Sequence, residues 1–406
     1  MKKTILLASA ALLAFIGCSR PVEDKSRQIV IWEMDDALVA PYMDSVLEAF
    51  KQLPGNEDLT ITRTHYGSED LRSQFQAASL AGVPPDLILS PSDTAGLYAV
   101  SGFIRPLEND FDFSKFNDAS VASVSLDGHT WGVPVTNGNH LMLLYNKRLA
   151  PNAPKTTDEL LNYCATTAKK LNLKYCLAFD SGEPFWLVPW IASFGGWPID
   201  GHTPTIDTQA TRDAIDFYRD LKYDKKYIPQ ECDYNCMDSL FKEEKIAFII
   251  NGDWALSSYQ QHFGKDFGIA LMPQNSKTGL WPAPMVSGKY FMISQGLGEE
   301  KTELLKRLIS FYVNEENQIR QFKEIARLPA LKTAGQSKEV LSDNNAILSL
   351  KQIEKGKPTP MATEIRAVWD SMRNYQGEAM ANRMDTDTAV RRMQEVAVKR
   401  IDEQNR

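Results

Sequence analysis

Short apolar runs alternate with amphipathic segments along the first hundred residues of the chain. Residues 28–32 and 86–90 are β-rich apolar runs, and residues 59–64 alternate as a strand with one buried face does. Residues 37–53 and 68–80 carry apolar side chains at helical spacing between those runs. Because strands and helices alternate in this order, the pattern predicts an α/β fold built on a mostly parallel, doubly wound sheet.

The length of 406 residues exceeds what one hydrophobic core usually serves, so it predicts two domains. The hydrophobic fraction of 43% and the charged fraction of 24% are those of a soluble globular protein. The formal net charge of −7 gives no reason to expect nucleic acid or an anionic membrane surface as a partner.

The N-terminus has the pattern of an export signal. Lys2 and Lys3 provide a basic start, and residues 5–16 are apolar over a length that is too short for a membrane-spanning helix. Residues 1–17 are therefore predicted to be a signal peptide.

Residues 15–18 (Phe-Ile-Gly-Cys) resemble the lipobox of bacterial lipoproteins, although Phe15 replaces the usual Leu. In that family the signal peptidase cuts before the cysteine, which then carries the lipid. The resemblance implies that Cys18 is lipidated and that residues 18–27 form a polar tether. The chain would then be anchored in the bacterial cell envelope, facing the periplasm or the exterior. The alternative is an ordinary signal peptide followed by a chance cysteine.

Four further cysteines follow Cys18, at positions 164, 176, 232 and 236. An even number in an exported protein permits disulfides, and four cysteines allow three connectivities. Pairing of Cys164 with Cys176 and of Cys232 with Cys236 closes short loops and is the expected arrangement. Cysteines spaced like the second pair, without a matching His or Cys pair, form a weak zinc pattern, so no metal is expected.

Acidic residues directly follow two of the predicted strands. Asp36 comes after the first strand and Asp93 after the third. Because ligands of open α/β sheets bind beyond the carboxyl ends of the strands, both residues are candidates for ligand binding. Capping the next helix is the other role open to these side chains.

Aromatic residues are concentrated in residues 183–197, together with a carboxylate and a Gly-Gly pair. Aromatic faces can cover the apolar face of a sugar ring while a carboxylate accepts hydrogen bonds from its hydroxyls. Glu183 and Phe185 flank Pro184 at the expected start of a helix and are candidate ligand residues. Trp190 and Phe194 are four residues apart, which favours packing inside the protein.

Several motifs resemble the family 1 extracellular solute-binding proteins, the sugar-capturing components of ABC importers. Their order and spacing extend over most of the chain that follows the tether. The motifs are 82–87 (Gly-Val-Pro-Pro-Asp-Leu), 96–99 (Gly-Leu-Tyr-Ala), 101–107 (Ser-Gly-Phe-Ile-Arg-Pro-Leu), 131–134 (Trp-Gly-Val-Pro), 144–147 (Leu-Tyr-Asn-Lys) and 153–160 (Ala-Pro-Lys-Thr-Thr-Asp-Glu-Leu).

The resemblance assigns roles to three of the candidate residues. In the maltodextrin-binding members, a Glu-Pro-aromatic motif supplies a carboxylate and a stacking ring, and Glu183 and Phe185 match it. Phe185 stands where those proteins have Tyr, so one hydroxyl hydrogen bond is lost. Residues 247–255 resemble the strand and turn that carry a stacking tryptophan, here Trp254. A tryptophan that only covers the core beside a Gly turn is the alternative.

The chain also departs from the family pattern. The tryptophan that the family carries after the third strand aligns with Ser90, and a nearby arginine aligns with Thr94. Another family tryptophan aligns near Ile365, where local alignment finds none in this chain. The departures leave the particular sugar open.

The fold implied by the resemblance is the type II-like, two-lobed periplasmic-binding-protein fold, with a mostly parallel sheet in each lobe. Three crossovers would join the lobes near 137–140, 279–288 and 331–340. Asn137 and Asn139 in the first crossover are further candidates for ligand binding. The expected lobes are residues 28–137 with 284–332, and residues 138–283 with 333–406.

The function implied is capture of a sugar or oligosaccharide between the lobes and delivery to the transmembrane subunits of an ABC permease, without catalysis or a cofactor. The protein is expected to be a monomer. An exported glycoside hydrolase would also combine aromatic rings with paired carboxylates. A lipoprotein adhesin that kept the fold without transport is the third possibility. None of the five histidines has a metal or triad spacing.

Overall fold

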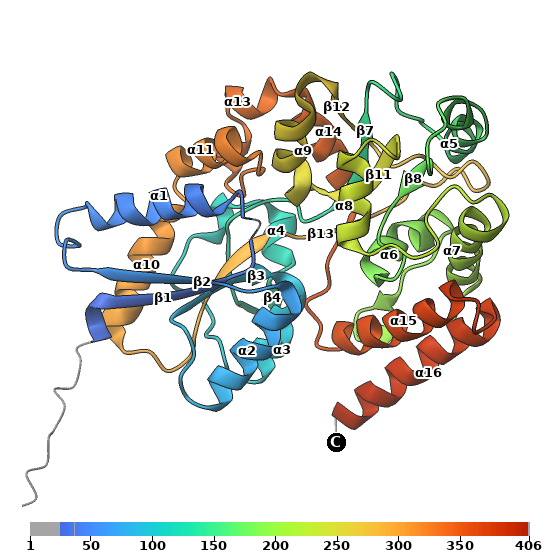
Figure 1. The fold of residues 1–406 in the computed structure, drawn as a ribbon. Coiled ribbons are helices and arrows are strands. Elements are labelled where there is room, and N and C mark those ends of the chain that lie inside the picture. Colours follow the sequence, from blue (N-terminus) through green and yellow to red (C-terminus); the bar gives the residue numbers. More distant parts are fainter. Residues whose placement is uncertain (1–24, 36, 405–406) are drawn as a thin grey trace, which may run out of the picture.

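The computed structural model describes residues 25–35 and 37–404, which form two α/β lobes side by side (Figure 1). The expected signal peptide, the lipidation site Cys18 and the candidate Asp36 lie outside the described residues. The end of the expected tether, Lys25–Arg27, forms a short 3-10 helix, and Arg27 pairs with Asp58 of the first lobe.

The first lobe is built on a five-stranded sheet with the strand order β2-β1-β3-β14-β6. The strands are β1 (Gln28–Glu33), β2 (Thr60–His65), β3 (Leu87–Pro91), β6 (Val133–Pro134) and β14 (Lys289–Ile293). Side chains alternate across β1, so Ile29 and Ile31 enter the cluster on one face of the sheet while Trp32 packs on the other.

Helices cover both faces of this sheet. Apolar side chains of α1 (Ala40–Lys51), α10 (Glu299–Tyr312) and α11 (Glu315–Ile325) form the core on one face. Side chains of α2 (Ser68–Leu80) and α3 (Ala95–Val100) form the core on the other face. The short helix α4 (Asp118–Ala122) lies near β6.

The second lobe is built on a four-stranded sheet with the order β12-β7-β11-β8. The strands are β7 (Leu141–Asn146), β8 (Leu177–Ala178), β11 (Phe248–Gly252) and β12 (Phe267–Ala270). The surrounding helices are α5 (Thr157–Tyr163), α6 (Pro184–Ser193), α7 (Gln209–Arg219), α8 (Tyr234–Lys242), α9 (Leu256–Phe263), α14 (Asn344–Ile353), α15 (Ile365–Met380) and α16 (Thr386–Gln404).

The expectation of a two-lobed α/β fold with mostly parallel sheets is confirmed, and in each sheet one strand runs against the others. β14 runs antiparallel to β3 and β6, and β7 runs antiparallel to β11 and β12. Both β7 and β14 follow a crossover from the other lobe. β7 therefore begins at the end of its sheet where β11 finishes, and β14 begins where β3 finishes. Strands that enter from that end run opposite to their neighbours.

Segments from distant parts of the sequence pair where the lobes join. Gly138 exchanges backbone hydrogen bonds of 2.8 and 3.1 Å with Ser287. β13 (Met285–Val286) pairs in parallel with β15 (Lys357–Pro358). The expected third crossover, 331–340, consists largely of the short helices α12 (Lys332–Gly335) and α13 (Lys338–Leu341) and is not extended. The remaining short hairpins are β4 (Ser125–Leu126) with β5 (His129–Thr130) and β9 (Ile199–Asp200) with β10 (Thr203–Pro204).

Both expected disulfides are present, Cys164–Cys176 and Cys232–Cys236. Within the described ranges, none of the helices is long and apolar enough to cross a membrane. The same ranges contain no group of three or more His, Cys, Asp or Glu side chains placed to hold a metal ion.

Candidate ligand-binding site

Three aromatic rings lie together at the edge of the second lobe. Phe185 comes from the first turn of α6, and Trp254 comes from the 3-10 turn Asp253–Ala255 that follows β11. Their ring centroids are 6.1 Å apart, and Trp369 of α15 lies 6.4 Å from Phe185. We call these three rings the aromatic platform. Phe185 and Trp254 are partly exposed, so they can cover a ligand, whereas Trp369 is largely buried behind them.

The sequence did not identify Trp369 as part of this site. Local alignment placed one tryptophan of the family near Ile365, which is buried one helical turn before Trp369 on α15. A four-residue shift keeps a side chain on the same face of a helix, so Trp369 supplies a ring from that face. The four-residue spacing between Ile365 and Trp369 was the feature of the sequence from which the place of Trp369 on this face could have been predicted.

The backbone of β11 makes room for Trp254. A Cβ atom on Gly252 would lie 2.1 to 2.3 Å from three atoms of the Trp254 ring, so glycine at this position lets the ring pack against the strand end. The indole nitrogen donates a hydrogen bond of 3.2 Å to the hydroxyl of Tyr234. The ring of Trp254 is therefore held from two sides.

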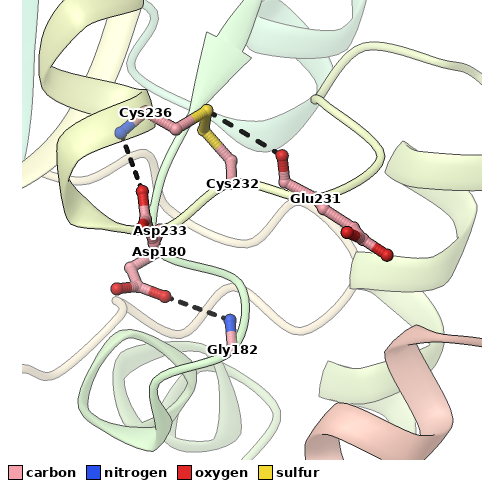
Figure 2. The surroundings of a disulfide bond; sticks show 6 residues. All are labelled: Asp180, Gly182, Glu231, Cys232, Asp233 and Cys236. Carbon is pink, nitrogen blue, oxygen red and sulfur yellow. Dashed lines mark hydrogen bonds between the residues drawn. A yellow bond between two sulfur atoms is a disulfide. The ribbon is translucent and has the colours of Figure 1, made fainter.

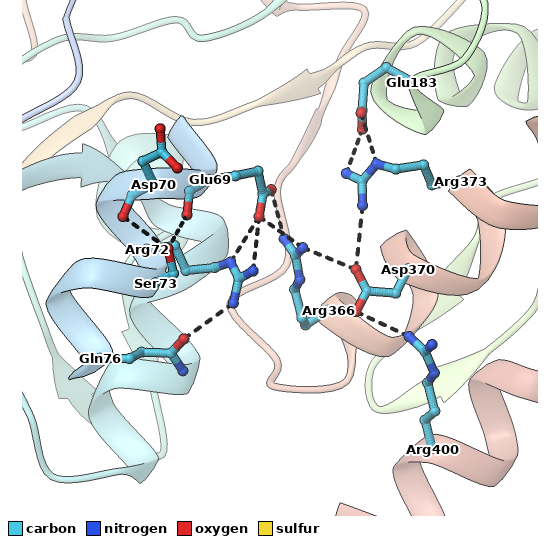
Figure 3. A network of polar contacts seen from close by, with 10 residues as sticks. All are labelled: Glu69, Asp70, Arg72, Ser73, Gln76, Glu183, Arg366, Asp370, Arg373 and Arg400. Atoms are coloured by element: carbon cyan, nitrogen blue, oxygen red, sulfur yellow. Dashed lines mark hydrogen bonds and ion pairs between the residues drawn. The ribbon is translucent and has the colours of Figure 1, made fainter. Parts of the chain in front are cut away.

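Glu183, the candidate carboxylate, is bound by a guanidinium group. Arg373 of α15 donates two hydrogen bonds to it, of 2.9 and 3.0 Å (Figure 3). A carboxylate paired in this way keeps oxygen lone pairs that can accept hydrogen bonds from hydroxyl groups. Glu183 thus remains a candidate ligand residue, with its orientation fixed by Arg373.

Ion pairs continue from Arg373 into the first lobe. Asp370 accepts from Arg373 at 3.3 Å and pairs with Arg366 at 3.0 Å. Arg366 in turn binds Glu69 of α2 through two contacts of 3.1 Å, as Figure 3 shows. The pair of Glu69 and Arg366 joins the helix α2 of the first lobe to the helix α15 of the second.

Asp93 lies in the turn that follows β3, as the sequence predicts for a residue beyond a strand end. Burial raises the pKa of its carboxyl group, while the positive charge of Arg366 acts in the opposite direction. Asp93 therefore belongs to the same electrostatic surroundings as the ion pairs between the lobes. Ser90, at the position of a family tryptophan, is buried and lies 3.2 Å from the hydroxyl of Thr94.

The two asparagines of the first crossover have different surroundings. Asn137 is buried, and its side-chain oxygen accepts a hydrogen bond of 3.2 Å from Ser120. Asn139 is partly exposed and has a positive φ of 48°. Its backbone N–H donates to the carboxylate of Asp253 at 3.2 Å. Of the two, only Asn139 has a side chain with access to solvent.

Asp253, which the sequence did not single out, is a buried carboxylate at this crossover. It accepts from the N–H groups of Asn139 and His140, and its own N–H donates to the carbonyl of His140 at 3.1 Å. Burial lowers the pKa of His140, so this imidazole is neutral near pH 7. The ring Nε2 lies 3.1 Å from the hydroxyl of Ser349. His140 is therefore a structural residue of the crossover.

Asp180 lies in the turn between β8 and Glu183. Burial raises the pKa of its carboxyl group to about 6, and the negative charges of Glu183 and Asp233 add to this effect. Its side chain accepts a hydrogen bond of 3.2 Å from the N–H of Gly182. Asp180 thus shapes the turn that presents Glu183 to the aromatic platform.

Comparison with known sequences identifies related proteins. The family described as bacterial extracellular solute-binding protein matches residues 45–347. A maltotriose-binding protein of Pyrococcus abyssi is 23% identical over 94% of this chain and 84% of its own length. A maltooligosaccharide ABC transporter solute-binding lipoprotein of Streptococcus pneumoniae is 24% identical over 96% of this chain and 95% of its own length.

Solved structures share the fold along nearly the whole chain. The maltose/maltodextrin-binding domain MalE from Bdellovibrio bacteriovorus, bound to maltotriose, has a TM-score of 0.86 and 33% identity, covering 92% of this chain and 99% of that one. The GacH receptor of Streptomyces glaucescens has a TM-score of 0.85 at 19% identity, covering 92% and 98%, and shares the fold.

Replacing Asp180 by Asn should change how stability depends on pH. The raised pKa means that the folded state holds this proton more tightly than the unfolded state, so wild-type stability falls as the pH rises from about 4 to about 6. A shift of two units corresponds to nearly 3 kcal/mol, and solvent screening of this partly exposed group reduces it to about 1–2 kcal/mol.

Urea unfolding at pH 4, 5, 6 and 7.5 measures this effect. We expect Asp180→Asn to be more stable than the wild type by about 1–2 kcal/mol at pH 7.5 and to lose the advantage near pH 4. Asp224→Asn, which neutralises an exposed carboxylate, serves as the control. If Asp180→Asn is stabilised by the same amount at all four pH values, the raised pKa of Asp180 is contradicted.

Proposed function

Because the chain belongs to the bacterial extracellular solute-binding proteins, we propose that it captures a linear oligosaccharide of glucose in the cleft between its lobes and delivers it to an ABC permease. The observation that carries the proposal is the aromatic platform beside the pair of Glu183 and Arg373. Neighbouring rings suit a chain of sugar units, because each pyranose can lie on an aromatic face while its hydroxyls reach polar groups at the edge.

The names of the relatives support this choice of ligand. Maltotriose and maltooligosaccharides appear in the names of the Pyrococcus and Streptococcus proteins, and the Bdellovibrio domain is bound to maltotriose. The first lobe has Ser90 in place of a family tryptophan, so stacking comes chiefly from the second lobe. We therefore propose a short oligosaccharide, with its chain direction set by the platform.

The arrangement of charge favours binding over hydrolysis. A retaining glycoside hydrolase needs a carboxylate free to attack the sugar, and Glu183 is instead bound through both oxygens by Arg373. The relatives named above are binding proteins. We propose that bound sugar is released intact.

The ion pair between Glu69 and Arg366 supports closure of the lobes around the ligand. It connects α2 with α15, so it is made only when the two helices approach each other. A ligand that contacts both lobes would favour the same approach, since it binds the closed arrangement more tightly.

We also propose export with lipid attachment at Cys18, which would place the protein at the membrane that holds its permease. The lipobox-like residues 15–18 support this placement, as does the relative from Streptococcus that is named a lipoprotein.

The first experiment is titration calorimetry of residues 19–406 with maltose, maltotriose and maltotetraose, followed by chromatography of the sugar. We expect binding without a change in chain length of the sugar.

Trp254→Ala should weaken binding by about 1–3 kcal/mol, the range for removing a large stacking side chain. Trp281→Ala is a matched control, because Trp281 is partly exposed, lies beneath Lys355 and is not one of the three platform rings. Hydrolysed sugar, or equal affinities of the two variants, would refute the proposal.

Replacing Glu69 by Gln should weaken oligosaccharide binding at low salt. Loss of a partly exposed ion pair typically removes about 0.5–1 kcal/mol, and the loss should fade near about 0.5 M salt because exposed charges are then screened. Glu48→Gln is the control, since Glu48 pairs with Lys51 inside one helix. If Glu69→Gln binds as the wild type does at low salt, this ion pair plays no part in closure.

Replacing Cys18 by Ser in the full chain should move the protein from the membrane fraction to the soluble fraction of the cell envelope, because one covalent anchor is lost. Immunoblotting of the two fractions measures the change. Retention of Cys18→Ser in the membrane fraction would mean that another element anchors the chain.

A further inference from the structure

The aromatic platform depends on a residue that does not belong to it. Tyr234, the first residue of α8, accepts the hydrogen bond of 3.2 Å from the indole nitrogen of Trp254. Its ring also packs edge-on against Trp186, at 6.4 Å between centroids, and Trp186 lies 6.1 Å from Trp254. The position of Tyr234 therefore limits how the Trp254 indole can turn.

Tyr234 lies between the two cysteines of a disulfide in the sequence. Figure 2 shows the disulfide between Cys232 and Cys236. The two cysteines are four residues apart, so their bond closes a ring of backbone that contains Tyr234. Asp233 caps α8 inside the same ring by accepting a hydrogen bond of 2.8 Å from the N–H of Cys236. Two constraints, one covalent and one polar, thus fix the first turn of α8 on either side of Tyr234.

The same ring borders the turn that carries Glu183. α8 packs against β8, the strand from which the turn departs, and Figure 2 shows Asp180 and Gly182 of that turn joined by their hydrogen bond. Asp233 is near enough to Asp180 for its charge to contribute to the raised pKa of that carboxyl group. The ring closed by the disulfide is therefore connected to the Trp254 ring through Tyr234 and to the Glu183 turn through Asp233.

We propose that the Cys232–Cys236 disulfide is a positioning element of the ligand site: it holds Tyr234 so that the Trp254 indole is oriented before ligand arrives. The proposal rests on the proposed function in that the affinity it predicts is for an oligosaccharide. Orientation in advance raises affinity, because a ring that must be immobilised during binding loses conformational freedom at that step.

The two disulfides close loops of different length, which allows the positioning role to be distinguished from general stabilisation of the fold. In the chain-entropy view, a disulfide stabilises a protein more when it closes a longer loop. Cys164 and Cys176 are twelve residues apart and connect the end of α5 to the residue before β8, whereas the second disulfide spans four residues. The two disulfides lie in the same lobe, so they form a matched pair for comparison.

The experiment compares Cys232→Ser/Cys236→Ser with Cys164→Ser/Cys176→Ser by thermal melting and by maltotriose titration. We expect the first variant to bind roughly tenfold more weakly with a small change in Tm. The second should keep its affinity within about twofold and show the larger fall in Tm. Tyr234→Phe keeps the ring and removes the hydroxyl acceptor, so it should weaken binding a few-fold without lowering Tm.

A readout without ligand distinguishes failure of this inference from failure of the proposed function. The indole N–H signal of Trp254 in a ¹H–¹⁵N spectrum, assigned with Trp254→Phe, should shift or broaden in Cys232→Ser/Cys236→Ser and in Tyr234→Phe, and stay in place in Cys164→Ser/Cys176→Ser. An unchanged signal in the first two variants overturns the inference. Unchanged maltotriose affinity of Cys232→Ser/Cys236→Ser also overturns it, provided that the wild type binds maltotriose. Absence of binding by the wild type, with the indole signal still shifted, overturns the proposed function and retains the positioning role.

Discussion

The carboxylate of Asp253 connects the crossover between the lobes to the aromatic platform. It accepts hydrogen bonds from the backbone of residues 139 and 140, and the residue that follows it is Trp254. Gly138 makes this contact possible, because its φ is 150° and a Cβ there would lie 2.1 Å from the Asp253 carboxylate. A buried carboxylate without these N–H partners would be strongly destabilising. The crossover and the platform are therefore fixed by one interaction.

The sequence predicted the fold where local pattern determines it. The strands β1, β2 and β3, with the helices between them, follow from hydrophobic periodicity, and both disulfides follow from short loop closure. Strand direction in the remainder depends on which lobe a segment comes from, and no local pattern records that origin. This is why the sequence did not predict that β14 and β7 run antiparallel to their neighbours.

In the candidate site too, the sequence predicted the residues that a local pattern marks and missed those that a long-range contact defines. Glu183, Phe185 and Trp254 were found because a motif or a strand end marks each of them, and the structure brings them together. Arg373, Tyr234 and Asp253 were missed. Each of them is defined by burial or by a contact with a residue far away in the sequence. A charged residue on a helix looks solvated from the sequence alone. Only its position opposite Glu183 distinguishes Arg373 from other exposed arginines.

Ion pairs join the carboxylates and guanidinium groups beside the aromatic platform. Glu183 is matched by Arg373, Glu69 by Arg366, and Asp370 lies between the two arginines. An anionic solute would have to displace a carboxylate from a guanidinium group, and a cationic solute would have to displace the guanidinium. A neutral polyhydroxylated solute avoids both costs, because its hydroxyls can use the lone pairs and N–H groups that the ion pairs leave over. The paired charges therefore agree with the neutral oligosaccharide proposed above, because its hydroxyls can bind without breaking these ion pairs.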